Sequence, residues 1–227
     1  MAVNPDICSM NILLTAATLF EIQPAIEFLT AQEFRLQKSN FNVLITGVGG
    51  MATTYHLTKS VQEKKPDFII QGGIAGSFRP EISIGSVVGV VEELLGDLGA
   101  EENNEFKDVF DMALMNENDF PFTRKILINP LLAGKEKYGV RGVRSVGINE
   151  VITRKERIEL IRKKYNPDIE SMEGAAFHYV CLHLNCPFLQ LRSISNYAGE
   201  RNKINWNIKA AIENLNTKLI EVISSPF

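Results

Sequence analysis

Two carboxylates and one carboxamide stand at positions where this sequence could bind and convert a small molecule. Glu173 follows a short apolar run and precedes a segment of small residues, Asn196 ends the next apolar run, and Glu21 comes soon after the first one. Ligands of open α/β sheets bind outside the carboxyl ends of strands, so polar residues there are the first candidates for a site. A carboxylate accepts hydrogen bonds, whereas a carboxamide donates and accepts but cannot act as a general acid.

Two glycine clusters mark further strand ends. They are GVGG (47–50) and QGGIAG (71–76). Glycines of this kind serve tight turns that need a positive φ, or let the backbone approach a sugar or a base. Neither cluster has the Gly-Lys-Ser/Thr ending of a Walker loop, and neither matches the full dinucleotide fingerprint.

Strands and helices alternate along the chain and must position these residues. Apolar runs predict strands at 11–17, 41–47, 67–73, 83–97, 139–147, 168–172 and 187–195. Helices are predicted at 153–164, 173–184 and 203–224, the last with an apolar stripe. This βαβ rhythm predicts an α/β fold with a largely parallel sheet. The polar stretch 99–122 is expected to be a loop, a lid or an interface.

The composition suits a single domain over residues 1–227. The chain has 227 residues, is 45% hydrophobic and has a formal net charge of −3, so it can bury one sizeable core but offers no basic patch for nucleic acid or an anionic membrane. No apolar stretch reaches the roughly 18 residues of a membrane span. Cys8, Cys181 and Cys186 lack metal-ligand spacing and are expected to be reduced thiols of a cytoplasmic protein. No metal and no cofactor is expected.

Three motifs occur together, PDFIIQGGIAG (66–76), ESMEGAAFHYVC (170–181) and PFLQLRSISN (187–196). They resemble the nucleoside phosphorylase and nucleosidase superfamily, in particular its purine nucleosidase branch, and the resemblance runs over nearly the whole chain. Met-Glu-Gly-Ala-Ala followed by Arg-x-Ile-Ser is a specific pair of motifs. The resemblance implies a three-layer α/β/α sandwich around a central mixed, largely parallel, twisted sheet.

The resemblance also implies roles for the candidate site residues. Met172 would pack on the ribose of a nucleoside, and Glu173 would accept hydrogen bonds from its 2′ and 3′ hydroxyls. Ala75 and Gly76 would line the base pocket, and Glu21 would bind and activate the attacking water. The other candidate positions for substrate binding are Gly49, Val151, Ser195 and Trp206. N-glycosidic cleavage passes through an oxocarbenium-like state, which carboxylates would stabilise.

Asn196 departs from the adenine-releasing nucleosidases, which place Asp after Ile-Ser. Its NH₂ can donate to a purine O6 while its oxygen accepts from a protonated N7, so it matches a 6-oxopurine. The resemblance then implies catalytic hydrolysis of futalosine, an intermediate on a route to menaquinone, with release of hypoxanthine. Futalosine carries a carboxyphenyl-propanone arm on its 5′ side. Trp206 would supply an aromatic wall for this arm, and Arg201 or Lys203 a cation, although surface charge is the simpler interpretation of both cations.

Water is the expected nucleophile. Phosphorylases of this superfamily hold phosphate with arginines near the glycine loops, and residues 46–54 and 71–77 contain none. Arg79 lies just beyond the second loop and is expected to be a solvated loop cation.

Each candidate residue also has a purely structural interpretation. Glu173 can be a carboxylate at a helix N-terminus, and Glu21 an exposed residue of a first helical turn. Asn196 can cap a turn, and Trp206 can be ordinary helix packing.

Two other functions fit the same sequence. One is a methylthioadenosine or adenosylhomocysteine nucleosidase, which Asn196 disfavours. The other is a nucleoside-binding module without catalysis, because the fold alone does not certify activity; the presence of both Glu21 and Glu173 argues against it. In each case the partner is a small-molecule nucleoside, with no nucleic acid and no membrane. The resemblance favours a homodimer in which residues 99–122 of a neighbour help to close the 5′ pocket.

Overall fold

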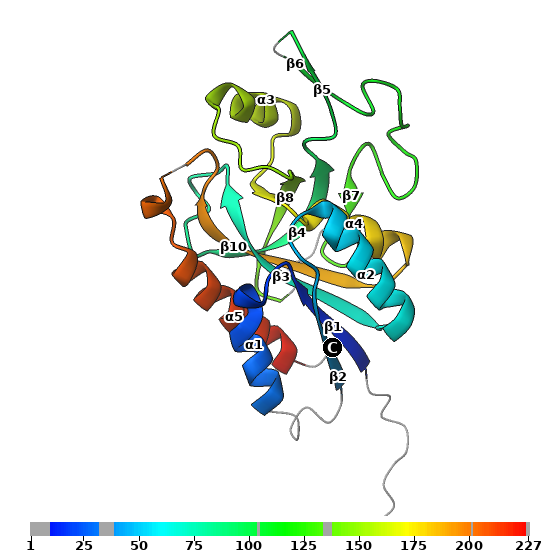
Figure 1. Cartoon of the computed structure of the whole chain (residues 1–227), viewed down its shortest axis with the longest axis vertical. Coiled ribbons are helices and arrows are strands. Elements are labelled where there is room, and N and C mark those ends of the chain that lie inside the picture. The colour runs from blue at the N-terminus through cyan, green and yellow to red at the C-terminus, as the bar shows by residue number, and fades with distance from the viewer. Residues whose placement is uncertain (1–9, 32–38, 104, 134–137, 201, 226–227) are drawn as a thin grey trace, which may run out of the picture.

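The computed structural model describes residues 10–31, 39–103, 105–133, 138–200 and 202–225 (Figure 1). Its strands are β1 (Met10–Ala16), β2 (Ser39–Ile45), β3 (Phe68–Ser77), β4 (Val87–Leu95), β5 (Gly99–Glu102), β6 (Glu105–Asp108), β7 (Leu127–Ile128), β8 (Arg141–Gly147), β9 (Ile169–Ser171) and β10 (Phe188–Tyr197). Its helices are α1 (Leu19–Ala31), α2 (Gly50–Lys64), α3 (Lys155–Tyr165), α4 (Gly174–His183) and α5 (Ile208–Ser224), with a 3-10 turn η1 (Lys203–Asn205). The strands and helices predicted from the sequence are all present.

One mixed sheet forms the centre of the molecule, and its strand β3 pairs with β1, β10 and β9. Strand β3 pairs in parallel with β1 and β10, and β1 pairs in parallel with β2. From β10 the pairing continues antiparallel to β4, parallel to β8, parallel to β9 and antiparallel back to β3. Strands β3, β10, β4, β8 and β9 therefore close into a ring, and the predicted mixed, largely parallel sheet is confirmed.

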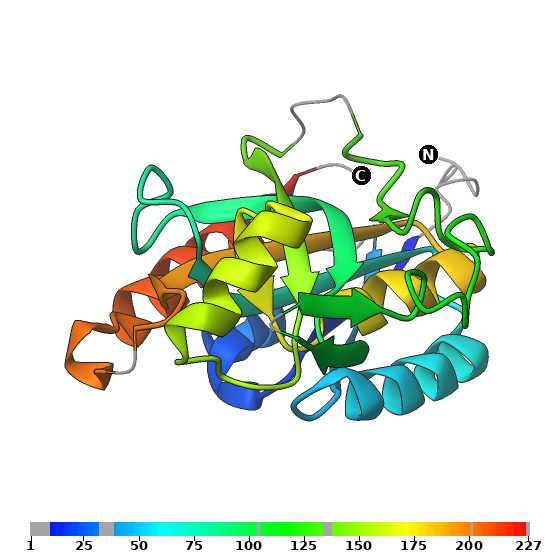
Figure 2. The same ribbon diagram turned by 90° about the horizontal axis from the view of Figure 1, so that it is seen from above.

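Helices cover both faces of the part of the sheet that β1 and β3 form (Figures 1 and 2). Ile12 and Leu14 of β1 belong to a buried cluster with side chains of α1 and α5. Leu13 points the other way, into a cluster with side chains of α2 and α4. A strand that is buried on both faces reads as a continuous apolar run, which explains the sequence of β1.

The last helix begins later than the sequence predicts. It was expected from Lys203, but Lys203–Asn205 form only the turn η1, Trp206 is extended, and α5 starts at Ile208. The cause is a local cap, because the Asn207 side chain accepts a hydrogen bond from the N–H of Ala210 at 3.1 Å. In the part of the chain that the structure describes, no helix is both long and apolar enough to cross a membrane.

The stretch 99–122 begins as the hairpin β5–β6, which projects beyond the main sheet (Figure 1). The turn that follows is held by ion pairs of Asp108 and Asp111 with Lys125 and with Lys164 of α3. Ring contacts join the same segment to α4, for example between Phe120 and His183. The described part of this stretch therefore packs on α3 and α4.

A carboxyl group lies in the core beneath α4. Glu93 of β4 is fully buried, and its Oε1 accepts a hydrogen bond from Gln190 Nε2 at 2.9 Å. Among the described residues, its Oε2 has no hydrogen-bond partner. Burial raises the pKa of Glu93 from 4.5 to about 7, because an apolar environment disfavours the charged form.

Replacing Glu93 by Gln should change how stability depends on pH. The raised pKa of Glu93 means that the folded chain holds a proton that the unfolded chain loses above about pH 4.5, so the wild type loses stability as pH rises from 4.5 to 7. Over this window the free energy of unfolding of Glu93→Gln should gain about 3 kcal/mol relative to the wild type. Urea unfolding at a series of pH values measures the difference. Exposed Glu81→Gln is the control, and a difference that stays constant for Glu93→Gln would contradict the prediction.

Candidate active site

A cavity of about 330 Å³ opens at the carboxyl ends of β1, β3, β9 and β10. These are the strand ends at which the sequence predicts a site. The predicted residues that line it are Glu21, Ala75, Gly76, Val151, Met172, Glu173, Ser195, Asn196 and Trp206. Gly49 is not on the cavity wall, and its backbone N–H instead contacts Glu173.

Glu21 is held by three hydrogen bonds. Its Oε2 accepts from the N–H and the hydroxyl of Thr18, both at 3.0 Å, and its Oε1 accepts from the N–H of Ile74 at 3.1 Å. The side chain lies in the first turn of α1, where the helix dipole favours a negative charge. Glu21 is only 7% exposed, so it is not the exposed first-turn residue of the structural interpretation. A carboxylate fixed in this way can orient a water molecule at the cavity wall.

Glu173 stands at the N-cap of α4, but its side chain does not cap that helix. Its Oε1 accepts from the N–H of Gly49 at 3.0 Å, and its Oε2 is paired with Arg192 Nη1 at 3.4 Å. Glu173 is therefore oriented by the turn before α2 and by a guanidinium of β10, and it lines the cavity. This arrangement argues against a role as a mere helix-terminal carboxylate.

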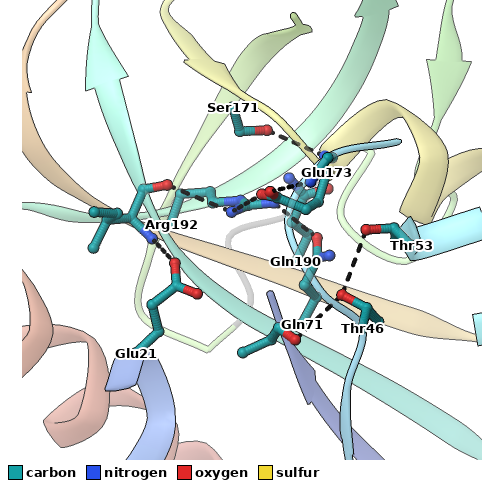
Figure 3. A network of polar contacts seen from close by, with 12 residues as sticks. Glu21, Thr46, Thr53, Gln71, Ser171, Glu173, Gln190 and Arg192 are labelled. Carbon is teal, nitrogen blue, oxygen red and sulfur yellow. Dashed lines mark hydrogen bonds and ion pairs between the residues drawn. The ribbon is translucent and has the colours of Figure 1, made fainter. Parts of the chain in front are cut away.

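Arg192 is a functional candidate that the sequence analysis did not single out. It comes from β10, is 1% exposed, and runs across the site toward Glu173 (Figure 3). Its Nη2 donates to Gln71 Oε1 at 3.0 Å, and its Nη1 donates to Glu173 and to the carbonyl oxygen of Ile74, each at 3.4 Å. An arginine in the middle of a predicted core strand is the signal that could have identified it, because a buried guanidinium needs partners.

The two glycine clusters serve different purposes. Gly47 and Gly49 have φ angles of +83° and +88°, as the tight turn before α2 requires. QGGIAG instead lies inside β3, so the turn interpretation is wrong for it. A side chain at Gly73 would collide with Arg192 Nη1, and one at Gly76 would collide with Glu170 Oε1. These two glycines therefore leave room for the side chains of neighbouring strands.

A β-bulge aims Asn196 into the cavity. On β10, Ile194 pairs with Ala75 and Asn196 pairs with Gly76, so Ser195 is an extra residue in the ladder. Consecutive strand residues normally point to opposite faces, whereas here Ser195 and Asn196 both line the cavity. The Ser195 hydroxyl donates to Asn196 Oδ1 at 2.7 Å, and Asn196 Nδ2 donates to the carbonyl oxygen of Tyr197 at 3.0 Å. These bonds orient the carboxamide.

Apolar side chains form the mouth of the cavity. Trp206 lies on its wall, and its indole Nε1 donates to the carbonyl oxygen of Glu200 at 2.9 Å. Val151 and Phe20, which are 62% and 64% exposed, also line it. Lys203 is exposed and does not line the cavity, and Arg201 lies outside the described residues.

The charged side chains on the cavity wall are acidic. They are Glu21, Glu150, Glu170 and Glu173, and no cationic side chain of the described residues lines the cavity. Glu170 is another residue that the sequence analysis did not single out. Burial raises its pKa to about 7. Arg79 is engaged elsewhere, since its Nε pairs with Asp168 at 3.1 Å. In the described ranges no group of three or more His, Cys, Asp or Glu is placed to hold a metal ion.

Comparison with known proteins identifies the family. Residues 21–224 match the model of the phosphorylase superfamily. Proteins from Thermus thermophilus and Streptomyces coelicolor named futalosine hydrolase are 30% and 29% identical, over 79% and 82% of this chain and 80% of each relative. A solved structure of 5′-methylthioadenosine/S-adenosylhomocysteine nucleosidase from Neisseria meningitidis has the same fold, with a TM-score of 0.75 and 19% identity over 96% of this chain and 100% of that one. The chain belongs to the phosphorylase superfamily.

Proposed function

We propose that the protein hydrolyses the N-glycosidic bond of futalosine and releases hypoxanthine. The observation that carries this proposal is the acidic wall of the cavity, on which carboxylates face the substrate and no described cation does. Such a wall repels a phosphate dianion and favours the positive charge that develops on the ribose. The 30% identity to the Thermus thermophilus futalosine hydrolase supports the choice of substrate.

Glu21 and Glu173 have different roles in the reaction. Glu21 accepts three hydrogen bonds from the protein, and with its remaining lone pair it orients water and accepts the proton of that water as the carbon–oxygen bond forms. Glu173 accepts hydrogen bonds from the ribose hydroxyls. Arg192 does not line the cavity; its pairing with Glu173 makes it a positioning residue that keeps this carboxylate facing the sugar.

Asn196 reads the base. Its NH₂ donates to O6 and its oxygen accepts from N7–H, so it fits a 6-oxopurine and opposes a 6-aminopurine. Because a carboxamide has no proton to give, the proton that neutralises the leaving base comes from solvent, and Asn196 stabilises the protonated N7 once it is formed.

The apolar mouth fits the arm of futalosine. Trp206, Val151 and Phe20 form a hydrophobic entrance beyond the ribose position, where an aryl-keto group gains free energy by burial. Met51 and Tyr55 are exposed apolar side chains of α2, and the exposed side chain of Val48, shortly before this helix, lines the cavity. They support a homodimer. We place the enzyme in the cytoplasm, in keeping with the two described cysteines, Cys181 and Cys186, which form no disulfide.

The reaction is tested with futalosine, its 6-amino analogue, inosine and methylthioadenosine, each with and without phosphate. Chromatography should detect hypoxanthine from futalosine at the same rate in both buffers, and a weaker reaction with the 6-amino analogue. A strict requirement for phosphate would show a phosphorylase. Preference for methylthioadenosine would assign the protein to the other nucleosidases, and the absence of any cleavage would favour a binding module.

Glu21→Gln should lower kcat by roughly a hundredfold or more, because it removes the general base, with a smaller effect on KM. Glu173→Gln should impair both kcat and KM, since contacts to the ribose strengthen as charge develops. Steady-state kinetics with futalosine measures both. Exposed Glu27→Gln, on the same helix as Glu21, is the matched control, and wild-type rates in both site variants would place the chemistry elsewhere.

Trp206→Ala should raise the KM for futalosine on the order of tenfold, because the arm loses an apolar wall. Inosine has no such arm, so its KM should change little. Trp206→Phe should restore most of the affinity. An equal effect of Trp206→Ala on both substrates would assign Trp206 to packing.

A further inference from the structure

Three neighbouring strands carry a row of residues across the inner end of the cavity. Glu170 of β9 pairs with Gly76 of β3, and Gly76 pairs on its other side with Asn196 of β10. All three residues line the cavity. Because Gly76 has no side chain, the row contains a slot that is bounded by a carboxyl group on one side and a carboxamide on the other.

Both polar groups reach over this slot. A Cβ atom on Gly76 would lie 2.8 Å from Glu170 Oε1 and 3.3 Å from Asn196 Nδ2. The NH₂ is thus the end of the Asn196 carboxamide that lies toward Gly76, and Glu170 lies on the other side of this glycine. The polar atoms follow one another as the Asn196 oxygen, the Asn196 NH₂ and the Glu170 carboxylate.

The carboxyl group of Glu170 has no partner among the described residues. Its carboxyl group makes no hydrogen bond or ion pair with any residue that the structure describes, in contrast to Glu21 and Glu173. Burial alone raises its pKa to about 7. A partly buried carboxyl group is costly without a partner. Glu170 lines the cavity, so a ligand bound there can supply that partner.

We propose that Glu170 accepts a hydrogen bond from N1–H of the leaving base and so selects 6-oxopurines together with Asn196. This inference rests on the proposed function and extends it to a second specificity-determining residue. Along the edge of hypoxanthine the groups follow as N7, O6 and N1–H, which matches the order of the Asn196 oxygen, the Asn196 NH₂ and Glu170. Adenine has a lone pair at N1 in place of the hydrogen, and a carboxylate repels it.

The test compares futalosine with its 6-amino analogue, which shares the same arm and sugar. In Glu170→Gln the new carboxamide can accept from N1–H or donate to a bare N1, so the preference for futalosine, as a ratio of kcat/KM values, should fall on the order of tenfold. The fold should persist, because the substitution conserves the size of the side chain and introduces no charge. Exposed Glu213→Gln of α5 should leave the ratio unchanged.

The outcomes separate this inference from the function on which it rests. If the wild type cleaves futalosine and Glu170→Gln keeps the same ratio, the role of Glu170 is overturned while the function stands. If the wild type does not cleave futalosine, the function fails, and calorimetric binding of hypoxanthine and adenine to both proteins decides for Glu170 alone. A preference for hypoxanthine that weakens in Glu170→Gln supports the inference there, and equal preferences overturn it.

Discussion

The arrangement of the site depends on the burial of one guanidinium group. Arg192 is 1% exposed, and a charge removed from water must be paired and hydrogen-bonded by the protein. Its partners come from two places, the side chain and backbone of β3 and the carboxylate of Glu173 at the start of α4. The requirement to satisfy Arg192 therefore ties β10, β3 and α4 together at the point where the cavity opens.

This pairing explains why neighbouring positions carry the residues they do. Gly73 leaves the space that the guanidinium fills. Glu173 gives one oxygen to Arg192 and the other to the N–H of Gly49, whose positive φ is adopted readily by glycine. The hydrogen bond to Gly49 also connects the turn before α2 to the site. The two glycine motifs look independent in the sequence. In the structure, both contribute to the packing around Arg192 and Glu173.

The sequence predicted the frame of the site well and its fine geometry less well. Strands β1 and β3 are buried on both faces, so their apolar runs identify them clearly in the sequence. Glu173 follows β9, and Asn196 lies near the end of β10, as expected. The bulge at Ser195 was not predictable, because the extra residue shows only when β10 is paired with β3. Arg192 and Glu170 were missed for a related reason: their place in the site depends on the pairing of strands that are distant in sequence. The late start of α5 follows from the cap at Asn207, a local signal that was present in the sequence.

The distribution of charge connects this geometry with the choice of nucleophile. The one cation close to the reacting groups, among the residues described, is the guanidinium of Arg192. It is bound to three acceptors and does not line the cavity, so it is not placed to hold a phosphate. The cavity itself presents carboxylates. The rest of the lining is mainly apolar, so the electric field of these carboxylates is weakly screened. This field disfavours an anionic nucleophile and stabilises a cationic sugar. Neutral water suits such a cavity, because it gains reactivity by losing a proton to a carboxylate and brings no charge of its own.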